Sequence, residues 1–380
     1  MRSLRERLNA VTSTPPKRKE PVSCVPDSFF MRETVIPLSK LRGIEQTTLE
    51  EIRSCDPYFT GDSWLYQKLL FLDTETTGLS GGAGTVAFEI GLGWIEPRGM
   101  VIRQYVMRDY HEEGPMLEAI AALIRQFDTI VSFNGKSFDL PLLESRMTMN
   151  RIRFAVTALP HFDLLHAARR VYKLRIGRCN LAKLEAALFG VERKEDLPGA
   201  LVPQRYFDFI KTGEFALLED VLRHNLQDVQ SLAELTAHLC GAFREPQNLQ
   251  HSQDVYCIGK MLLRTGHKEK GRRCLRMASS GMMFAKSYMA LSQSYKKDRD
   301  WPQAVSSWQD MIARGEGGVW PYIELAKYHE HIEKDCEMAL FYAQYALRFS
   351  LNRSLLGREG AEQNDLIIKR IARLKRKLER

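Results

Sequence analysis

The strongest constraint in the sequence is an apolar run that ends in two carboxylates, FLDTETTGL at residues 71–79. The apolar part is typical of a buried strand, and we expect that strand to end at Asp73. Since strand residues two apart point to the same face, Asp73 and Glu75 would converge on one spot. Two like charges held that close repel each other, and a divalent cation between them makes the arrangement favourable. The simpler interpretation is a polar strand end that runs into a turn, and it holds unless more acids follow downstream.

The composition is that of an ordinary soluble globular protein, with 44% hydrophobic and 27% charged residues. No apolar run reaches the ~20 residues that a membrane-spanning helix needs, and the charged N-terminus does not have the form of a secretory signal. The seven cysteines contain no C-x-x-C pair, which favours reduced thiols over a zinc site or a disulfide framework. We therefore expect a cytoplasmic protein with no membrane partner.

The net charge of +8 is concentrated at the two ends of the chain. Residues 1–20 contain six Lys and Arg against two Glu, and residues 366–380 contain seven against one, so the body between them is slightly acidic. Basic ends suit a phosphate backbone, and solvated tails are the simpler interpretation.

The pattern changes along the chain predict five segments in 380 residues. Residues 1–25 indicate a flexible basic arm, and residues 26–68 form an N-terminal extension to which the sequence assigns no role. Residues 69–243 alternate strand and helix patterns, which predicts an α/β domain. Residues 250–350 are helical throughout, and residues 351–380 end in a basic helix.

Within these segments the periodicity predicts individual elements. One predicted strand ends at Asp73, and three further predicted strands cover residues 85–95, 100–107 and 129–133. Predicted helices cover residues 38–53, 115–127, 140–150, 163–173, 180–189 and 214–241.

An internal repeat marks the helical segment. Tyr288, Leu291, Ser292, Tyr295, Ala304 and Trp308 recur about 34 residues later as Tyr322, Leu325, Ala326, His329, Ala339 and Ala343. A weaker copy precedes them in Val255, Ile258, Gly259, Leu262, Gly271, Leu275 and Ala278. These spacings resemble the tetratricopeptide pattern, in which small and aromatic residues interlock two antiparallel helices. A generic helical bundle is the alternative.

The last segment is predicted to be an amphipathic helix. Its apolar residues recur at helical spacing, namely Ile367, Ile368, Ile371, Leu374 and Leu378. Lys369, Arg370, Arg373, Lys375, Arg376, Lys377 and Arg380 cover much of the rest. We expect the apolar side to dock on the repeats and the basic side to meet phosphates.

Two further acids follow downstream of the first pair. Asp139 opens a predicted helix in VSFNGKSFDLPLL at residues 131–143, and alone it is most simply an N-cap. Asp228 lies four residues after His224 in LRHNLQDV at residues 222–229, so the two share one face of a predicted helix. In isolation such a pair is usually a surface contact.

Taken together, D-x-E-T-T-G-L, N-x-x-x-F-D and the late helical Asp resemble the three motifs of the DEDD 3′–5′ exonuclease group of the ribonuclease H-like superfamily, in the same order. The resemblance covers residues 69–241. The whole chain is similar to the bacterial YprB-like family of ribonuclease H-like proteins. The expected fold is an α/β ribonuclease H-like domain, with a mixed central sheet and flanking helices, followed by an all-α tetratricopeptide-like repeat domain.

The resemblance implies a metal-dependent 3′–5′ exonuclease acting on DNA or RNA, with single-stranded 3′ ends as substrates. Asp73, Glu75, Asp139 and Asp228 would hold two Mg²⁺ or Mn²⁺ ions. Asp73 would bridge the ions, Glu75 and Asp228 would favour the ion on the side of the attacking water, and Asp139 the ion on the side of the leaving group.

One position departs from the superfamily, which places its water-orienting residue either as His five positions before the last Asp or as Tyr four before it. Here Arg223 occupies the first position and His224 the second. These positions differ by ~100° around a helix. His224 is the candidate general base, because imidazole exchanges a proton near neutral pH. The departure raises the prospect of a core with weak or no nuclease activity.

Further residues are candidates for contact with nucleic acid. Leu79 and Phe138 match positions that contact the terminal nucleotide in the superfamily, Asn134 would steady the motif and Lys136 would touch phosphate. Core packing or solvation explains these four equally well. Arg169, Arg170, Lys173 and Arg175 surround Tyr172 in a basic patch that suits a single strand, and a solvated helix face is the alternative.

Two other functions remain open from the sequence. The chain could be an adaptor, whose repeats bind a protein partner while a degenerate nuclease core binds nucleic acid without cutting. It could also be a structure-selective endonuclease. The sequence does not distinguish DNA from RNA as the ligand.

Overall fold

A computed structural model describes residues 28–41, 43–78, 84–193, 197–354 and 361–379. The chain forms two compact units. The first comprises Met1–Arg169 and Arg178–Gly241, and the second comprises Arg170–Gly177 and Ala242–Arg380. Leu79 lies outside the described residues.

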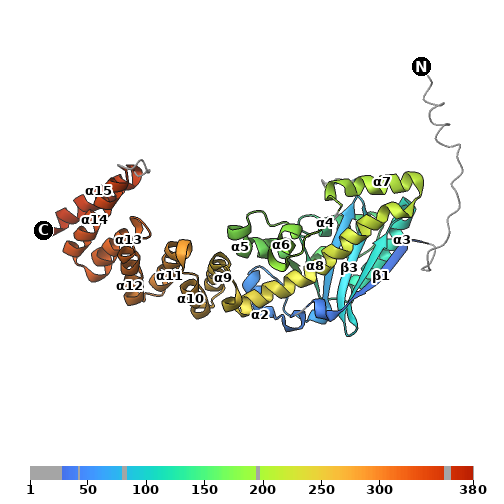
Figure 1. The fold of residues 1–380 in the computed structure, drawn as a ribbon, viewed down its shortest axis with the longest axis horizontal. Helices are drawn as coiled ribbons and strands as arrows, with labels where there is room; N and C mark the ends of the chain where they lie inside the picture. Colours follow the sequence, from blue (N-terminus) through green and yellow to red (C-terminus); the bar gives the residue numbers. More distant parts are fainter. Residues whose placement is uncertain (1–27, 42, 79–83, 194–196, 355–360, 380) are drawn as a thin grey trace, which may run out of the picture. The chain divides into compact units, whose positions relative to one another are not determined.

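The first unit is built on a six-stranded sheet in the order β1-β4-β3-β2-β5-β6 (Figure 1). The strands are β1 (Phe30–Ile36), β2 (Leu69–Thr76), β3 (Ala87–Glu96), β4 (Gly99–Val106), β5 (Thr129–Ser132) and β6 (His161–Asp163). β2 pairs antiparallel with β3 and parallel with β5. The sheet is therefore mixed, and helices flank it, which confirms the predicted ribonuclease H-like architecture.

Two of these strands were not predicted. β1 pairs antiparallel with β4 from Phe30 opposite Val106 to Ile36 opposite Met100, so part of residues 26–68 belongs to the sheet. β1 is an edge strand whose residues are mostly half-exposed, and it lacks the alternation of apolar and polar residues that identifies a strand. β6 has three residues, too few for a periodic pattern.

Among the residues that the structure describes, seven α-helices accompany the sheet. They are α2 (Leu49–Cys55), α3 (Glu113–Ile124), α4 (Asp139–Met149), α5 (Leu164–Ile176), α6 (Leu181–Phe189), α7 (Val202–Thr212) and α8 (Glu219–Arg244). The helix predicted over 38–53 is wrong for most of its length, because the described residues of this range form α2 and two short 3-10 turns instead. α7 was not predicted, and its buried Tyr206 ring stacks on Phe88 at a centroid distance of 4.2 Å.

The sheet presents different faces to α3 and α8. Leu70 and Leu72 of β2 and Ile90 of β3 join the main hydrophobic core together with Ile120 of α3. On the other face, a Cβ at Gly91 of β3 would lie 2.1 Å from Oδ1 of Asn225 in α8. Glycine is therefore required at this position for α8 to reach the sheet. The close approach brings the side chains of α8 next to the odd-numbered residues of β2.

The described part of the second unit is helical, and consecutive helices pack against one another (Figure 1). Besides the ends of α5 and α8, it contains α9 (Ser252–Arg264), α10 (Lys268–Met277), α11 (Phe284–Lys297), α12 (Trp301–Ala313), α13 (Trp320–Tyr328), α14 (Cys336–Ser354) and α15 (Ala361–Leu378). A Cβ at Gly271 of α10 would lie 2.9 Å from the carbonyl oxygen of Gly259 in α9, so the two backbones touch at these small residues. Trp308, Leu325, Ala339 and Ala343, which belong to the repeat pattern, are all buried.

Candidate active site

The first two acids lie at the end of β2, on the face toward α8. β2 continues to Thr76, so the prediction that the strand ends at Asp73 is wrong, and the extension keeps Asp73 and Glu75 in strand geometry. The side-chain amide of Asn225 in α8 donates to Oδ2 of Asp73 at 3.0 Å. Asn225 is fully buried, and the sequence did not single it out.

α8 adds His224 and Asp228 to the same place. Nε2 of His224 lies 3.7 Å from Oε1 of Glu75 and 3.7 Å from Oδ2 of Asp228. The side chains of His224 and Asp228 are 14% and 15% exposed, so this pair is not a surface contact. The imidazole links the acid on the strand to the acid on the helix.

Asp139 approaches from α4. It is the first residue of the helix, and the N-cap position belongs to Phe138, so the interpretation of Asp139 as an N-cap is wrong. The hydroxyl of Thr74 donates to Oδ1 of Asp139. Thr74 lies between Asp73 and Glu75 in β2, so its side chain points to the opposite side of the strand. Thr74 therefore contacts Asp139 of α4, whereas Asp73 and Glu75 face α8.

The pKa shifts of these carboxyl groups show how burial and neighbouring charges act on them. Burial raises the pKa of Asp73 well above its ordinary value, and the charges of Asp228, Glu75 and Asp139 raise it further. Burial raises the pKa of Asp139 to about 6, although the bond from the Thr74 hydroxyl opposes this shift. Negative charge is therefore unfavourable at the end of β2 unless a cation compensates it.

Arg193 supplies one such cation, and the sequence analysis missed it. Its guanidinium forms a bidentate pair with Glu185 of α6, at 2.6 and 2.7 Å, and also donates to Oδ1 of Asp228. Burial would lower the pKa of Arg193, but its bonds to Glu185 and Asp228 raise it. Burial raises the pKa of Asp228 against the opposing charges of His224 and Arg193. The Arg193 guanidinium nevertheless pairs directly with the Asp228 carboxyl group.

Arg193 also contacts the histidine. Its Nη1 lies 3.5 Å from Nδ1 of His224. Since arginine only donates, Nδ1 accepts this bond, and the proton of the neutral ring is then on Nε2, toward Glu75 and Asp228. No sequence signal marks Arg193, which lies 35 residues from Asp228 in an ordinary polar loop.

The donor set fits a hard divalent cation. Carboxylate oxygens are the ligands that Mg²⁺ and Mn²⁺ prefer, and the raised pKa of Asp73 reflects the repulsion that such an ion relieves. Within the part of the chain that the structure describes, however, no three His, Cys, Asp or Glu side chains are grouped closely enough to hold a metal ion. The four acids Asp73, Glu75, Asp139 and Asp228 therefore do not form a compact set of metal ligands in this arrangement.

The loop between β5 and α4 is held by Asp163, at the end of β6. Its carboxylate accepts from the backbone N–H groups of Asn134 and Lys136 at 2.9 and 3.2 Å, and from that of Leu165 at the start of α5 at 3.0 Å. The side chains of Asn134 and Lys136 are exposed, and Phe138 is half-buried. Asp163 is therefore a structural acid that fixes the loop carrying these candidates.

The predicted basic patch on α5 is divided among different environments. Arg169 and Lys173 are exposed. Nε of Arg175 instead pairs with Oδ2 of Asp254 at 2.7 Å, and its guanidinium lies 5.8 Å from the ring centre of Tyr172. Arg170 is half-buried. Arg175 thus has a structural partner, whereas Arg169 and Lys173 extend into solvent.

A cavity of about 240 Å³ adjoins the site. Its lining comes from α8 and from the loop after α6, and comprises Val191, Glu192, Arg193, Leu197, Asp220, Arg223, His224, Leu226, Gln227 and Gln230. Arg193 and His224 both form part of its wall.

Residues 70–240 match the RNase_H superfamily. The uncharacterised protein YprB of Bacillus subtilis (strain 168) is 32% identical over 370 residues, which cover 92% of this chain and 86% of YprB. The solved family B DNA polymerase from the hyperthermophilic archaeon Pyrobaculum calidifontis is 16% identical with a TM-score of 0.32, and the match covers 60% of this chain but 29% of the polymerase. Among the described residues, no helix combines the length and the apolar character needed to cross a bilayer.

Proposed function

The chain belongs to the family of Bacillus subtilis YprB, and from that premise we propose that it is a metal-dependent 3′–5′ exonuclease that hydrolyses phosphodiester bonds of DNA or RNA. The observation that carries the proposal is the meeting of Asp73, Glu75, Asp228 and His224 at the end of β2. Buried carboxylates held together are costly without a counter-ion. Buried carboxylates at such a site are therefore best explained by a reaction that uses bound cations.

We assign the binding of two Mg²⁺ or Mn²⁺ ions to Asp73, Glu75, Asp139 and Asp228. When bound, such ions generate a nucleophile from water and stabilise negative charge on the leaving oxygen. The charges of all three other acids act on Asp73, so Asp73 would be a central ligand of such ions.

We assign the role of general base to His224, whose Nε2 faces Glu75 and Asp228. Both carboxylates stabilise the imidazolium that forms when the ring takes a proton from water. In the arrangement described, Arg193 donates to Nδ1, which leaves the neutral ring no free lone pair. Arg193 must therefore release Nδ1, so that the ring proton can move from Nε2 to Nδ1 and Nε2, which faces Glu75 and Asp228, can accept the proton of water. The same guanidinium neutralises Asp228, so its movement frees the acid and the base together.

Three groups of residues complete the proposal. Asn134, Lys136 and Phe138, on the loop fixed by Asp163, would contact the terminal nucleotide, and Leu79 is assigned with them on its sequence match alone. Arg169, Arg170, Lys173 and Arg175 would guide a single strand, with Arg169 and Lys173 the best placed because they are exposed. Helices within residues 250–350 would form tetratricopeptide-like repeats, which is supported by the burial of Ala304, Trp308, Ala339 and Ala343.

The test uses single strands labelled at the 5′ or the 3′ end, incubated with Mn²⁺ and sampled over time. The proposal expects 5′-labelled strands to shorten stepwise and 3′-labelled strands to release labelled mononucleotide from the start. A 3′-phosphate should block the reaction, because the enzyme begins at a free 3′ end. Internal cuts that ignore the block would instead identify a structure-selective endonuclease.

A second candidate function is an adaptor that binds nucleic acid without cutting it. It is favoured by the ion pair between Arg193 and Asp228, which occupies one proposed metal ligand. In an adaptor this pair would persist, and the repeats would hold a protein partner. The adaptor predicts that no strand shortens at any Mn²⁺ concentration while strand binding is retained.

A further inference from the structure

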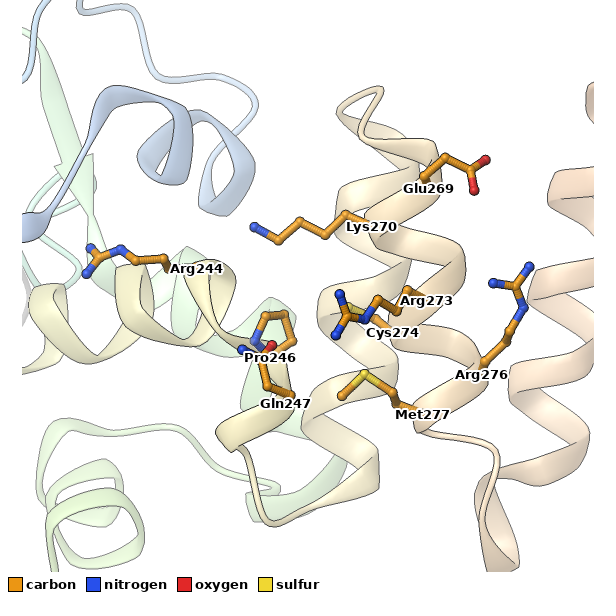
Figure 2. Close-up of a pocket in the computed structure, with 9 residues that line it drawn as sticks. All are labelled: Arg244, Pro246, Gln247, Glu269, Lys270, Arg273, Cys274, Arg276 and Met277. Atoms are coloured by element: carbon orange, nitrogen blue, oxygen red, sulfur yellow. The ribbon is translucent and has the colours of Figure 1, made fainter.

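A second concave site lies in the helical unit, apart from the acids. It is a cavity of about 520 Å³ beside α10, at the end of α8 and the turn Pro246–Asn248 (Figure 2). Its lining comprises Arg244, Pro246, Gln247, Glu269, Lys270, Arg273, Cys274, Arg276 and Met277. Four of these nine residues are cationic and one is acidic, so the cavity attracts anions.

The cations of α10 divide into two groups. Figure 2 shows Lys270 and Arg273 extending to the same side of α10, whereas Glu269 and Arg276 extend away from that side. Arg276 donates to the hydroxyl of Tyr295, and Glu269 pairs with Nη1 of Arg272 at 3.0 Å. The only acid in the lining is therefore already neutralised.

Lys270 and Arg273 are exposed, and among the described residues neither has an ion-pair or hydrogen-bond partner for its charged group. Two charges three residues apart on a helix are neighbours that repel each other. Neighbouring cations on the same helix show a different pattern, since both Lys268 and Arg272 pair with Asp298. Within the part of the chain that the structure describes, Lys270 and Arg273 thus remain uncompensated, unlike Lys268 and Arg272.

The cavity also has an apolar part, which a plain solvated helix face lacks. Pro246 and Cys274 are buried in its wall, and Met277 is 38% exposed next to them. Gln247, on the facing turn, offers both a donor and an acceptor. Two cations beside an apolar surface and one amide suit a ligand that joins phosphate oxygens to a flat base.

We propose that this cavity binds nucleoside phosphates of a single-stranded nucleic acid, with Lys270 and Arg273 on consecutive phosphates and one base against Met277. The proposal rests on the proposed function for the class of ligand, and it adds a strand-binding site that takes no part in hydrolysis. A free mononucleotide carries the same chemistry, so the experiment must separate the two sources.

The experiment measures fluorescence anisotropy of a labelled single strand with the full chain in EDTA, at several salt concentrations. The test variant is Lys270→Gln with Arg273→Gln. Each lost phosphate contact should make the slope of log K against log salt shallower by ~0.7. Two contacts should lower the affinity about 25-fold near 0.1 M salt. Arg264→Gln with Lys297→Gln, two exposed cations outside the cavity, changes the net charge equally and should have little effect.

The outcomes separate this proposal from the proposed function, because binding in EDTA does not depend on cleavage. Equal affinity and salt slope in the cavity variant and the wild type would overturn the strand-binding site, whatever the nuclease assay shows. Equal losses in the two double variants would also overturn it, since bulk charge alone would then explain them. A mononucleotide at equimolar concentration could also displace the strand from the wild type but not from the cavity variant. That result would show that the ligand of the cavity is a free nucleotide and not a strand.

Discussion

At the scale of single residues, the account depends on one histidine and one arginine that share a wall of the same cavity. Position −4 from the last acid is occupied by His224, and its imidazole reaches Glu75 and Asp228 there. The sequence marked His224 and the four acids as candidates, because each is near a recognisable local pattern. It did not identify Arg193 or Glu185, because their role arises from contact across loops with no spacing to reveal it.

The first prediction concerns His224→Ala. If the imidazole takes the proton of water, kcat should fall by ~10²–10⁴, the usual size for a general base. Strand affinity should change much less, because the four acids remain. His224→Tyr should recover part of kcat, since it restores the side chain that the superfamily carries at this spacing.

The matched control is His166→Ala, which removes an exposed histidine of α5. Its kcat should equal that of the wild type. A folded His224→Ala protein with near-wild-type kcat and a lower Tm would reduce His224 to a structural link between two carboxylates.

The second prediction concerns Arg193→Gln. Without the guanidinium, Asp228 is free for a cation, so saturating Mn²⁺ should raise Tm more in this variant than in the wild type. In EDTA the variant should be less stable by about 3–5 kcal/mol, the cost of removing one partner of a buried pair, because Glu185 is 1% exposed.

Arg193→Lys keeps the charge and loses the bidentate geometry. It should lower Tm in EDTA without enlarging the Mn²⁺ shift. Identical Mn²⁺ shifts in the wild type and Arg193→Gln would show that the guanidinium does not compete with metal at Asp228.

At the scale of elements, α15 shows how far an amphipathic pattern can predict. Ile367 and Leu374 are buried and Ile371 packs beside them, as expected. The docking predicted for Ile368 and Leu378 is wrong, since they are 49% and 42% exposed. Periodicity specifies a helix and a general apolar direction, but the neighbouring helices decide how wide the buried stripe is.

The basic side of α15 also differs from the expectation. Arg370, Arg373 and Lys377 all pair with Glu330, at 2.5, 2.7 and 2.9 Å, so these three hold the helix in place. Glu330 is fully buried and lies in a π-helical turn after α13. A sequence pattern cannot show that these cations pair with Glu330, a buried acid 40 to 47 residues away.

The third prediction concerns Glu330→Gln. Burial alone would raise the pKa of Glu330, but the surrounding cations lower it to about 2. Because the pKa of Glu330 is lower in the folded state, the carboxylate stabilises the fold at any pH above its ordinary pKa of 4.5. This stabilisation is lost as the pH falls toward 2. The variant should therefore unfold more easily at pH 7 and match the wild type near pH 2.

The expected loss at pH 7 is about 1–3 kcal/mol, measured by urea unfolding. This is less than for a fully buried pair, because Arg373 and Lys377 are 46% and 43% exposed. Glu316→Gln, at an exposed position, should leave the free energy of unfolding unchanged. A loss that is the same at pH 2 and pH 7 would contradict the electrostatic explanation.

At the scale of the whole molecule, the sequence predicted the mixed sheet and the helical segment that follows it. β2, β3, β4 and α8 were predictable because they are long and strongly patterned. β1 and β6 were not, because an edge strand and a three-residue strand carry weak local signals. α7 was missed although its sequence is amphipathic. The pairing of β1 with β4 and the packing of Tyr206 on Phe88 are long-range contacts that no local pattern encodes.

The most direct test of the central claim is the Mn²⁺-dependent hydrolysis of a 5′-labelled single strand by Asp73→Asn. The charges of all three other acids act on Asp73, which is the reason for its proposed place among the metal ligands. The variant should therefore lose hydrolysis almost completely and still bind the strand. Its Tm in EDTA should rise, because asparagine removes a repelled, buried carboxylate. Loss of turnover with retained binding and a raised Tm is the predicted result. Metal-dependent shortening of the strand at the wild-type rate would contradict the account.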